Sequence, residues 1–287
     1  QLLIHLRITP YATLVMSMIA AVSLFVTYAF YNKIMLLGTD SFLVTPESAR
    51  SLEEKKLYNV VEEMKVAAGL HYMPKVYVIE ANYMNAFASG YSEKSAMVAI
   101  TRGLMNKLDR QELQAVMAHE LTHIRHQDIK LTLTVSVLSN LLLMVIDMLF
   151  YSMLFGGNRS NNRNNKNGNN GLFLVVMVLR FVLPFITALL TLFLSRTREF
   201  MADSGAVSLM RDNEPLARAL IKINNDHQDN SESNAVEYGQ TSHESVRRAS
   251  YIFDPAKFSS TSNFSDMFST HPALTKRLKS IGFKSDK

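Results

Sequence analysis

Residues 118–127 read A-H-E-L-T-H-I-R-H-Q, and this stretch decides how the rest of the chain is interpreted. His119 and His123 are four residues apart, so on a helix they lie one turn apart on the same face, where two imidazoles can bind one zinc ion. Glu120 is turned about 100° from His119, which directs its carboxylate toward a water on the metal. The pattern favours a catalytic metal site over a surface helix that carries these residues by chance.

The motif helix has a recognisable start, but it does not supply a third metal ligand. Asp109 and Glu112 form a pair typical of a helix N-terminus, an acceptor followed three residues later by an acid. His126 shares a face with His119, but seven residues span about 10.5 Å of helix axis, too far for both to bind the ion that His123 binds. We therefore predict that His126 is a surface histidine and that the third ligand lies elsewhere.

The composition indicates that part of the chain lies in lipid. Charged residues make up only 19% of the 287 residues, which is low for a soluble enzyme. The net charge is +5, but Lys and Arg are scattered and form no patch with aromatic residues, so nucleic acid is not an expected partner. The absence of cysteine excludes disulfides and thiolate ligands for a metal.

Three apolar runs are each long enough to cross a bilayer core as a helix. Residues 11–31 form the first run, and we assign residues 1–33 as an N-terminal transmembrane segment. The other two runs, 131–155 and 172–194, flank an Asn- and Gly-rich tract at 156–171 that predicts a mobile loop. The lipid bilayer is therefore an expected partner.

Residues 131–194 are thus predicted to form a transmembrane helical hairpin. Asp147 and Arg180 lie near the middle of its two apolar runs, where a charge needs a partner. Either the two side chains pair with each other, or the hairpin lies partly outside the lipid and both charges contact water. The sequence leaves both alternatives open.

This hairpin makes Glu199 the strongest candidate for the third ligand. The motif helix runs into the first apolar run, and the second ends just before Arg196, so two crossings return the chain to the surface it left. Glu199 then lies on the same side of the membrane as His119 and His123. Asp203, one turn further on, is placed to accept a hydrogen bond from a ligand histidine. The alternative is an ordinary solvated acidic face.

The parts on either side of the hairpin, residues 34–130 and 195–287, are predicted to form one metallopeptidase domain. We expect a mainly α-helical structure with a small β-sheet, whose strands are predicted at 75–80 and 96–101 from their β-branched residues. Residues 82–95 lie between these strands. They form either a plain connecting loop or an edge strand that offers backbone groups to an extended substrate.

Capping and turn signals predict further helices and one long loop. A helix is expected to start at Thr45, where T-P-E provides a capping hydroxyl and a proline in the first turn. Residues 195–206 are expected to be helical, and another helix is expected to begin near Asp212. Residues 224–244 are polar with little periodicity and predict a long loop. A last helix is expected to end near Gly282.

Four motifs occur in the sequence: N-A-F at 85–87, H-E-L-T-H at 119–123, R-E-F-M-A-D at 198–203 and T-H-P-A-L-T-K-R at 270–277. In these motifs the sequence resembles the HtpX family of membrane-bound zinc metallopeptidases, relatives of the CAAX prenyl endopeptidases. The order of the motifs, and the two apolar runs before R-E-F-M-A-D, agree with the family pattern. The resemblance implies a gluzincin-like α+β catalytic domain with transmembrane helices. Because members carry two apolar helices before the soluble part, it also implies a helix preceding Gln1.

The resemblance further implies which residues form the metal site. One zinc ion per chain would bind to His119, His123 and Glu199. Glu120 would be the catalytic residue, and Asp203 would lie next to a metal ligand without binding the metal itself.

It also implies which residues surround the metal. Asn85, Ala86 and Phe87 would lie at the substrate edge. His271 would lie near the metal and help to stabilise the oxyanion, and Arg277 would tie its helix to the acidic residues.

The implied function is hydrolysis of peptide bonds in misfolded or damaged membrane proteins, as stress-related quality control in the bacterial inner membrane. The positive-inside rule favours a multi-pass protein whose catalytic domain faces the cytoplasm. Five basic residues flank the spans on the catalytic side, against three in the Asn-rich loop: Lys33, Arg125, Lys130, Arg196 and Arg198 against Arg159, Arg163 and Lys166. The alternatives are a non-hydrolytic membrane metal-binding or scaffold protein and a CAAX-type prenyl-peptide endopeptidase. The sequence leaves the oligomeric state open.

Overall fold

The computed structural model describes residues 30–155, 166–240, 247, 250–253 and 271–284, with four single positions before residue 30. The chain divides into two compact units. One comprises Gln1–Ala29 with Thr132–Phe193, and the other comprises Phe30–Leu131 with Leu194–Lys287. The transmembrane segment predicted at 11–31 lies mostly outside the described residues.

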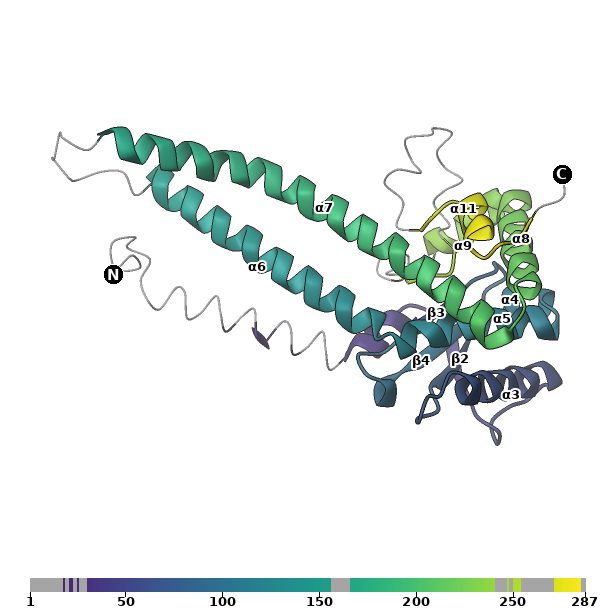
Figure 1. Cartoon of the computed structure of the whole chain (residues 1–287). Coiled ribbons are helices and arrows are strands. Elements are labelled where there is room, and N and C mark those ends of the chain that lie inside the picture. The colour runs from purple at the N-terminus through teal and green to yellow at the C-terminus, as the bar shows by residue number, and fades with distance from the viewer. Residues whose placement is uncertain are drawn as a thin grey trace. The chain divides into compact units, whose positions relative to one another are not determined.

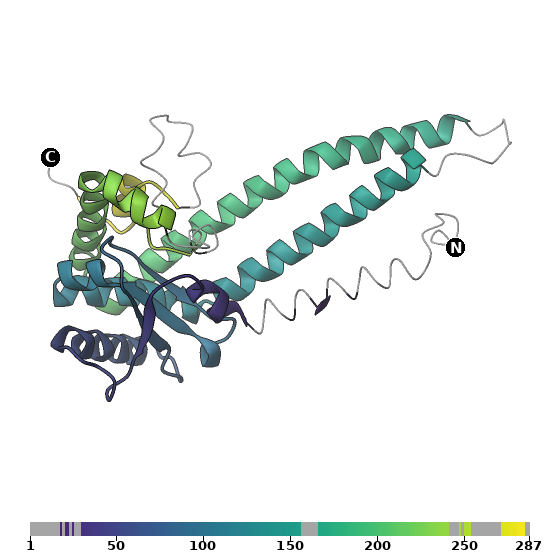
Figure 2. The same ribbon diagram turned by 180° about the vertical axis from the view of Figure 1, so that it is seen from behind.

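The larger unit, Phe30–Leu131 with Leu194–Lys287, combines helices with one small sheet, which confirms the predicted fold class (Figures 1 and 2). Its elements, in chain order, are β1 (Ser41–Val44), α3 (Leu52–Ala67), β2 (Lys75–Ile79), β3 (Ala86–Ser89), the 3-10 helix η1 (Glu93–Ser95), β4 (Met97–Thr101), α4 (Arg102–Lys107), α5 (Arg110–Arg125), α8 (Glu214–Asp229), α9 (Ser231–Gln240) and α11 (Leu274–Ser280). Helices α6 (Asp128–Phe155) and α7 (Lys166–Met210) connect this unit to the other.

The sheet has the strand order β1-β2-β4-β3, so β3 is an edge strand. Its two central strands, β2 and β4, are parallel, and both edge strands run antiparallel to their neighbours. Every residue of β4 is buried, as is typical of a central strand with both faces covered. The strands predicted at 75–80 and 96–101 are confirmed. Within residues 82–95, the structure supports the edge-strand alternative over the plain loop.

Two predicted helix starts had different outcomes. The pair that begins α5 forms a reciprocal capping box, in which the Asp109 carboxylate accepts from the Glu112 N–H and the Glu112 carboxylate accepts from the Asp109 N–H. The predicted start at Thr45 is wrong, because α3 begins at Leu52 with Ser51 as its N-cap. The Thr45 hydroxyl instead bonds within a local turn.

The predicted loop at 224–244 is also wrong over its described part. Helix α8 continues to Asp229, and α9 follows after a single residue. Leu216, Leu220, Ile223 and His227 form one buried stripe along α8, so its apolar periodicity continues through a histidine. Polar residues on the exposed face conceal that stripe when composition alone is considered.

The smaller unit contains a pair of helical segments, residues 132–155 of α6 and 166–193 of α7. Among the described residues, two helices are long and apolar enough to cross a membrane, Asp128–Tyr151 and Gly171–Met210. Large apolar side chains remain exposed along them, and Phe181 is 72% exposed. Such exposed apolar surface is expected where lipid replaces water as the solvent.

Within this unit, the charges in the two apolar runs are paired. Arg180 Nε lies 3.0 Å from an Asp147 carboxylate oxygen, which agrees with the pairing alternative. Arg180 Nη2 donates to the Tyr151 hydroxyl at 3.0 Å. Helix α7 begins at Lys166, inside the tract predicted to be a loop. The rest of that tract, 156–165, lies outside the described residues.

Candidate metal centre

Helix α5 presents the motif residues to the interior of the larger unit. It lies between α3 and α8 and contacts β3 as well, so most of its surface is covered (Figures 1 and 2). His119 and Glu120 are buried, and His123 is partly buried. The Nε2 atoms of His119 and His123 lie 3.2 Å apart, as one-turn spacing on a single helix predicts.

Helix α7 brings Glu199 to these two imidazoles. One carboxylate oxygen lies 3.8 Å from His119 Nε2, and the other lies 3.6 Å from His123 Nε2. The three ligand atoms all lie within 4.8 Å of one another. Ligands about 2.1 Å from a tetrahedral ion are separated by about 3.4 Å, so the observed spacings fit a metal ion with only small adjustments.

A carboxylate lies behind each imidazole. Asp203 is 3.0 Å from His119 Nδ1, and Asp128 is 2.6 Å from His123 Nδ1. Such contacts fix the tautomer that leaves Nε2 free to bind a metal. The sequence predicted Asp203 for this position but did not predict Asp128. Asp128 is itself held by Arg198, which donates to its main-chain carbonyl at 2.7 Å.

Glu120 lies beside the ligands without belonging to them. Burial raises the pKa of Glu120 to about 7, against the lowering effect of His123. The main-chain N–H of Ala88, in β3, also faces this carboxylate and favours its charged form. A carboxyl group that titrates near neutral pH is suited to accept and donate a proton in one catalytic cycle.

The ligand imidazoles are affected in opposite directions. Burial lowers the pKa of His119, although Asp203 partly compensates. Burial also acts to lower the pKa of His123, but the hydrogen bond with Asp128 and the Glu199 charge raise it above the usual value.

Helix α11 and the residues before it complete the site. Arg277 donates two hydrogen bonds to Asp203, at 2.9 and 2.6 Å, and its guanidinium lies 3.8 Å from Glu199. His271 Nδ1 lies 3.2 Å from a Glu199 oxygen, and the His271 side chain is only 3% exposed. The structure therefore brings these two residues to the carboxylates that also meet the motif histidines.

Ala86 and Phe87 lie on β3, Asn85 directly precedes it, and all three are buried. Asn85 is bonded within the protein, because its amide donates to the Tyr238 hydroxyl and the Phe253 carbonyl, both at 3.1 Å. The Ala86 carbonyl accepts from the Ile252 N–H at 2.9 Å. His126 lies apart from the metal ligands and is exposed at the end of α5, as predicted.

Two histidines one turn apart, a glutamate between them and an acid from a second helix define a metallopeptidase of the H-E-x-x-H type. The chain belongs to peptidase family M48, because the model of that family matches residues 51–282.

Several relatives are similar over most of their length. The chain is 42% identical to a protease HtpX homolog of Helicobacter pylori over 279 residues, which cover 97% of this chain and 83% of that protein. It is 37% identical to a protease HtpX homolog of Listeria monocytogenes over 264 residues, covering 88% and 83%. For a protease HtpX homolog of Dictyoglomus thermophilum the identity is 33% over 260 residues, covering 90% and 79%.

A solved structure has the same fold. The crystal structure of S. mikatae Ste24p superposes with a TM-score of 0.60 at 19% identity, covering 96% of this chain and 59% of that one. Family membership, the cluster of possible metal ligands and the two apolar helices identify the chain as a membrane metalloendopeptidase.

Proposed function

We propose that the chain hydrolyses peptide bonds with one zinc ion held by His119, His123 and Glu199. The observation that carries this proposal is the spacing of their ligand atoms, all within 4.8 Å of one another and drawn from two helices. Two imidazoles and one carboxylate are a donor set that zinc uses in catalytic sites. Zinc held there would act as a Lewis acid and would lower the pKa of a bound water to about 7.

The protein's own groups perform the proton transfers. Glu120 accepts a proton from the attacking water and passes it to the amine that leaves, a role suited to its near-neutral pKa. Asp203 and Asp128 hold the ligand imidazoles in one tautomer. His271 donates to the oxygen that becomes negatively charged, a role supported by its position 3.2 Å from Glu199, and Arg277 holds Asp203 in position.

Glu120→Gln tests the proposed base. We expect this variant to bind one zinc ion per chain, because all three ligands remain, and to lose cleavage of casein by at least about 100-fold. Glu112→Gln is the matched control, because Glu112 is also buried on α5 but bonds to Lys222 away from the ligands. It should retain both zinc and cleavage. Casein cleavage by Glu120→Gln at the wild-type rate would exclude the role of base.

The proposed substrates are unfolded or damaged membrane proteins, and the proposed location is the bacterial inner membrane, with several spans and a cytoplasmic catalytic domain. The resemblance to the HtpX proteases and the basic residues near the spans support this proposal. A tag inserted into residues 156–165 tests the orientation. Protease added to intact spheroplasts should cleave the tag, and protection of the tag there would contradict the orientation.

The two alternatives are less well supported. A non-hydrolytic scaffold needs no base beside a metal, whereas Glu120 lies beside the ligands and the chain belongs to a peptidase family. For a CAAX-type endopeptidase, the likeness to Ste24p shows the fold alone, and the described residues contain only two candidate spans. Casein cleavage that a chelator abolishes would exclude the scaffold, and cleavage of prenylated peptides alone would favour the CAAX-type enzyme.

A further inference from the structure

Helices α5 and α7 are in tight contact beside the metal ligands, at Thr122 and Gly205. Thr122 directly precedes His123 on α5, and Gly205 lies two residues after Asp203 on α7. A Cβ atom placed on Gly205 would lie 2.8 Å from the Thr122 hydroxyl oxygen and closer still to its methyl group. Such distances essentially never occur for a real Cβ, so only glycine fits this contact.

The Thr122 side chain cannot move away easily. It is 2% exposed, and its hydroxyl donates to the Ala118 carbonyl at 2.8 Å. Rotation about its first side-chain bond would exchange the methyl and hydroxyl positions without emptying the space, and its own Cβ would remain 3.2 Å away. A larger residue at 205 therefore has to separate the two helices.

The required separation is large compared with the tolerance of a metal site. Normal carbon contacts need about 3.5 Å, so an added Cβ demands a displacement on the order of 1 Å between α5 and α7. Metal–ligand distances tolerate only about 0.2 Å. Glu199 moves with α7, whereas His119 and His123 stay with α5.

We infer that Gly205 is a positioning residue for the metal centre. Because it has no side chain, α5 and α7 pack closely enough for Glu199 and Asp203 to reach the two histidines. A glycine inside a helix destabilises the helix relative to alanine. The close contact with Thr122 explains why α7 has a glycine at this position. The inference rests on the proposed function, because it concerns the zinc ligands.

Zinc affinity, measured by competition with a chromophoric chelator, tests this inference. Gly205→Ala should bind zinc about 10–100-fold more weakly, the usual loss when ligands are poorly held. Thr122→Ala should bind zinc nearly as tightly as the wild type. The double variant Thr122→Ala/Gly205→Ala should recover most of the lost affinity, because the clashing atoms are gone.

Gly239→Ala is the matched control, because Gly239 lies in helix α9 with nothing within 4 Å of the added Cβ. It should leave zinc affinity unchanged. Wild-type affinity in Gly205→Ala, or no recovery in the double variant, would overturn the inference, as would a Gly205→Ala protein that does not fold. If the wild type itself does not bind zinc, the proposed function fails instead.

An independent observation concerns the outer edge of β3, where residues 250–253 lie against it. Phe87 and Tyr251 form an antiparallel bridge, and the Ile252 N–H donates to the Ala86 carbonyl at 2.9 Å. Tyr251 and Ile252 are each only 1% exposed. The edge on which an extended substrate is expected is therefore covered, over this length, by the chain itself.

Main-chain and side-chain contacts both hold residues 250–253 in place. The Tyr251 ring packs edge-on against Phe87 with ring centroids 5.6 Å apart. Ile252 and Phe253 belong to the buried core. The Ile252 carbonyl accepts from Arg277 at 2.8 Å, and the Phe253 carbonyl accepts from Asn85 at 3.1 Å. Any extended peptide can offer such carbonyls, whatever its side chains. The segment is also near the catalytic groups, because Arg277 lies 3.8 Å from Glu199.

The geometry points to residues 250–253 as an internal competitor for the substrate strand: they occupy the edge of β3 until a substrate peptide replaces them. This inference also rests on the proposed function. Once the segment has left, the Arg277 and Asn85 side chains would donate to main-chain carbonyls of the bound peptide.

A reversible crosslink tests this competition. The chain has no cysteine, so the variant Phe87→Cys/Tyr251→Cys can form only one disulfide. The two positions form an antiparallel bridge, and the Cα atoms of such a pair lie about 4.5–5.5 Å apart, a distance that a disulfide can span. The oxidised protein should cleave casein at least about tenfold more slowly than the same protein after reduction. Equal rates in the two states would overturn the inference.

Hydrogen exchange on the Glu120→Gln variant provides a second measurement without changing the contact. A casein-derived peptide is added at a saturating concentration, and fluorescence anisotropy measures its binding. The bound peptide should speed exchange at the Ile252 amide while β3 stays protected. Unchanged or slower exchange at Ile252 would overturn the competition, as would peptide that does not bind. Casein cleavage by this variant would instead overturn the proposed base.

Discussion

Two clusters in the larger unit pair an arginine with two carboxylates, yet only one of them has the geometry of a metal centre. At the metal centre, Arg277 faces Asp203 and Glu199, and the three side chains are between 0 and 6% exposed. At the other cluster, Arg102 pairs with Glu54 at 3.1 Å and also with Glu80. There the Arg102 side chain is 24% exposed and that of Glu80 is 40% exposed.

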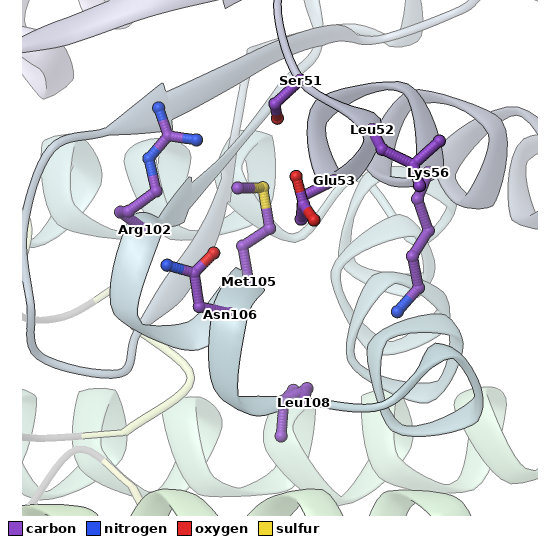
Figure 3. A pocket seen from close by; sticks show the side chains of 8 residues that line it. All are labelled: Ser51, Leu52, Glu53, Lys56, Arg102, Met105, Asn106 and Leu108. Atoms are coloured by element: carbon purple, nitrogen blue, oxygen red, sulfur yellow. The ribbon is translucent and has the colours of Figure 1, made fainter.

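The second cluster borders an open pocket of about 650 Å³ (Figure 3). In Figure 3, Arg102 and Lys56 lie on opposite sides of this pocket, with Glu53 between them. The pocket is lined by Ser51, Leu52, Glu53, Lys56, Arg102, Met105, Asn106 and Leu108. Its lining contains no histidine, and Glu54 is bonded to its own helix start and to Arg102.

The difference shows that residue type alone does not make a site. Arg102 and Glu80 reach solvent, so the ion pair between them contributes little energy, and the buried Glu54 also accepts from the Arg50 N–H. Near Arg277 each charge depends on another protein group, because water is excluded. This dependence keeps the carboxylates oriented toward the imidazoles.

Removal of each arginine should give the largest contrast between the clusters. Arg277→Met leaves buried carboxylates without their cation and should lower the free energy of unfolding by roughly 3–5 kcal/mol. Arg102→Met should lower it by about 1 kcal/mol or less, because Glu80 is partly solvated and Glu54 keeps its bond from the Arg50 N–H. Urea unfolding of the detergent-solubilised proteins measures both values. Equal losses would show that burial does not distinguish the clusters.

A smaller effect should follow when a carboxylate acts through an imidazole. Asp128→Asn keeps the side-chain shape but weakens the hold on His123, and we expect zinc affinity to fall about 10–100-fold. Glu80→Gln is the control from the exposed cluster and should leave zinc affinity unchanged. Chelator competition measures both. An unaffected Asp128→Asn protein would mean that another group fixes the His123 tautomer.

Asp128 also shows where sequence reasoning reached its limit. His119, Glu120 and His123 were predictable because a regular helix turns sequence spacing directly into geometry. Asp128 lies beyond the end of α5, and it returns to His123 because Gln127 adopts a φ of 56° between the two helices. This conformation is uncommon for a residue other than glycine, and nothing in the local sequence indicates it.

Contacts between distant segments were predictable only where topology limited the choices. Glu199 was predicted because two crossings return the chain to one surface, and it lies beside the motif histidines. By contrast, the contact of residues 250–253 with β3 joins segments far apart in sequence, and no periodic pattern signals it. Strand β1 was missed as well, since four residues are too few to show a clear alternation.

The smallest predicted effect depends on pH and concerns Glu54. Burial by itself raises the pKa of Glu54, but hydrogen bonds from the Arg50 N–H and the Arg102 side chain lower it below the usual value.

A carboxyl group with a lowered pKa in the folded state stabilises the protein above its unfolded pKa of about 4.3. This contribution is lost as the pH falls through the folded value. Glu54→Gln should therefore cost about 1 kcal/mol at pH 7, and the difference from the wild type should shrink progressively below about pH 4.3. Urea unfolding at a series of pH values measures it. A difference that stays constant down to pH 3 would mean that the Glu54 side chain acts through its shape rather than its charge, and the Arg102 cluster would then owe its stability to packing.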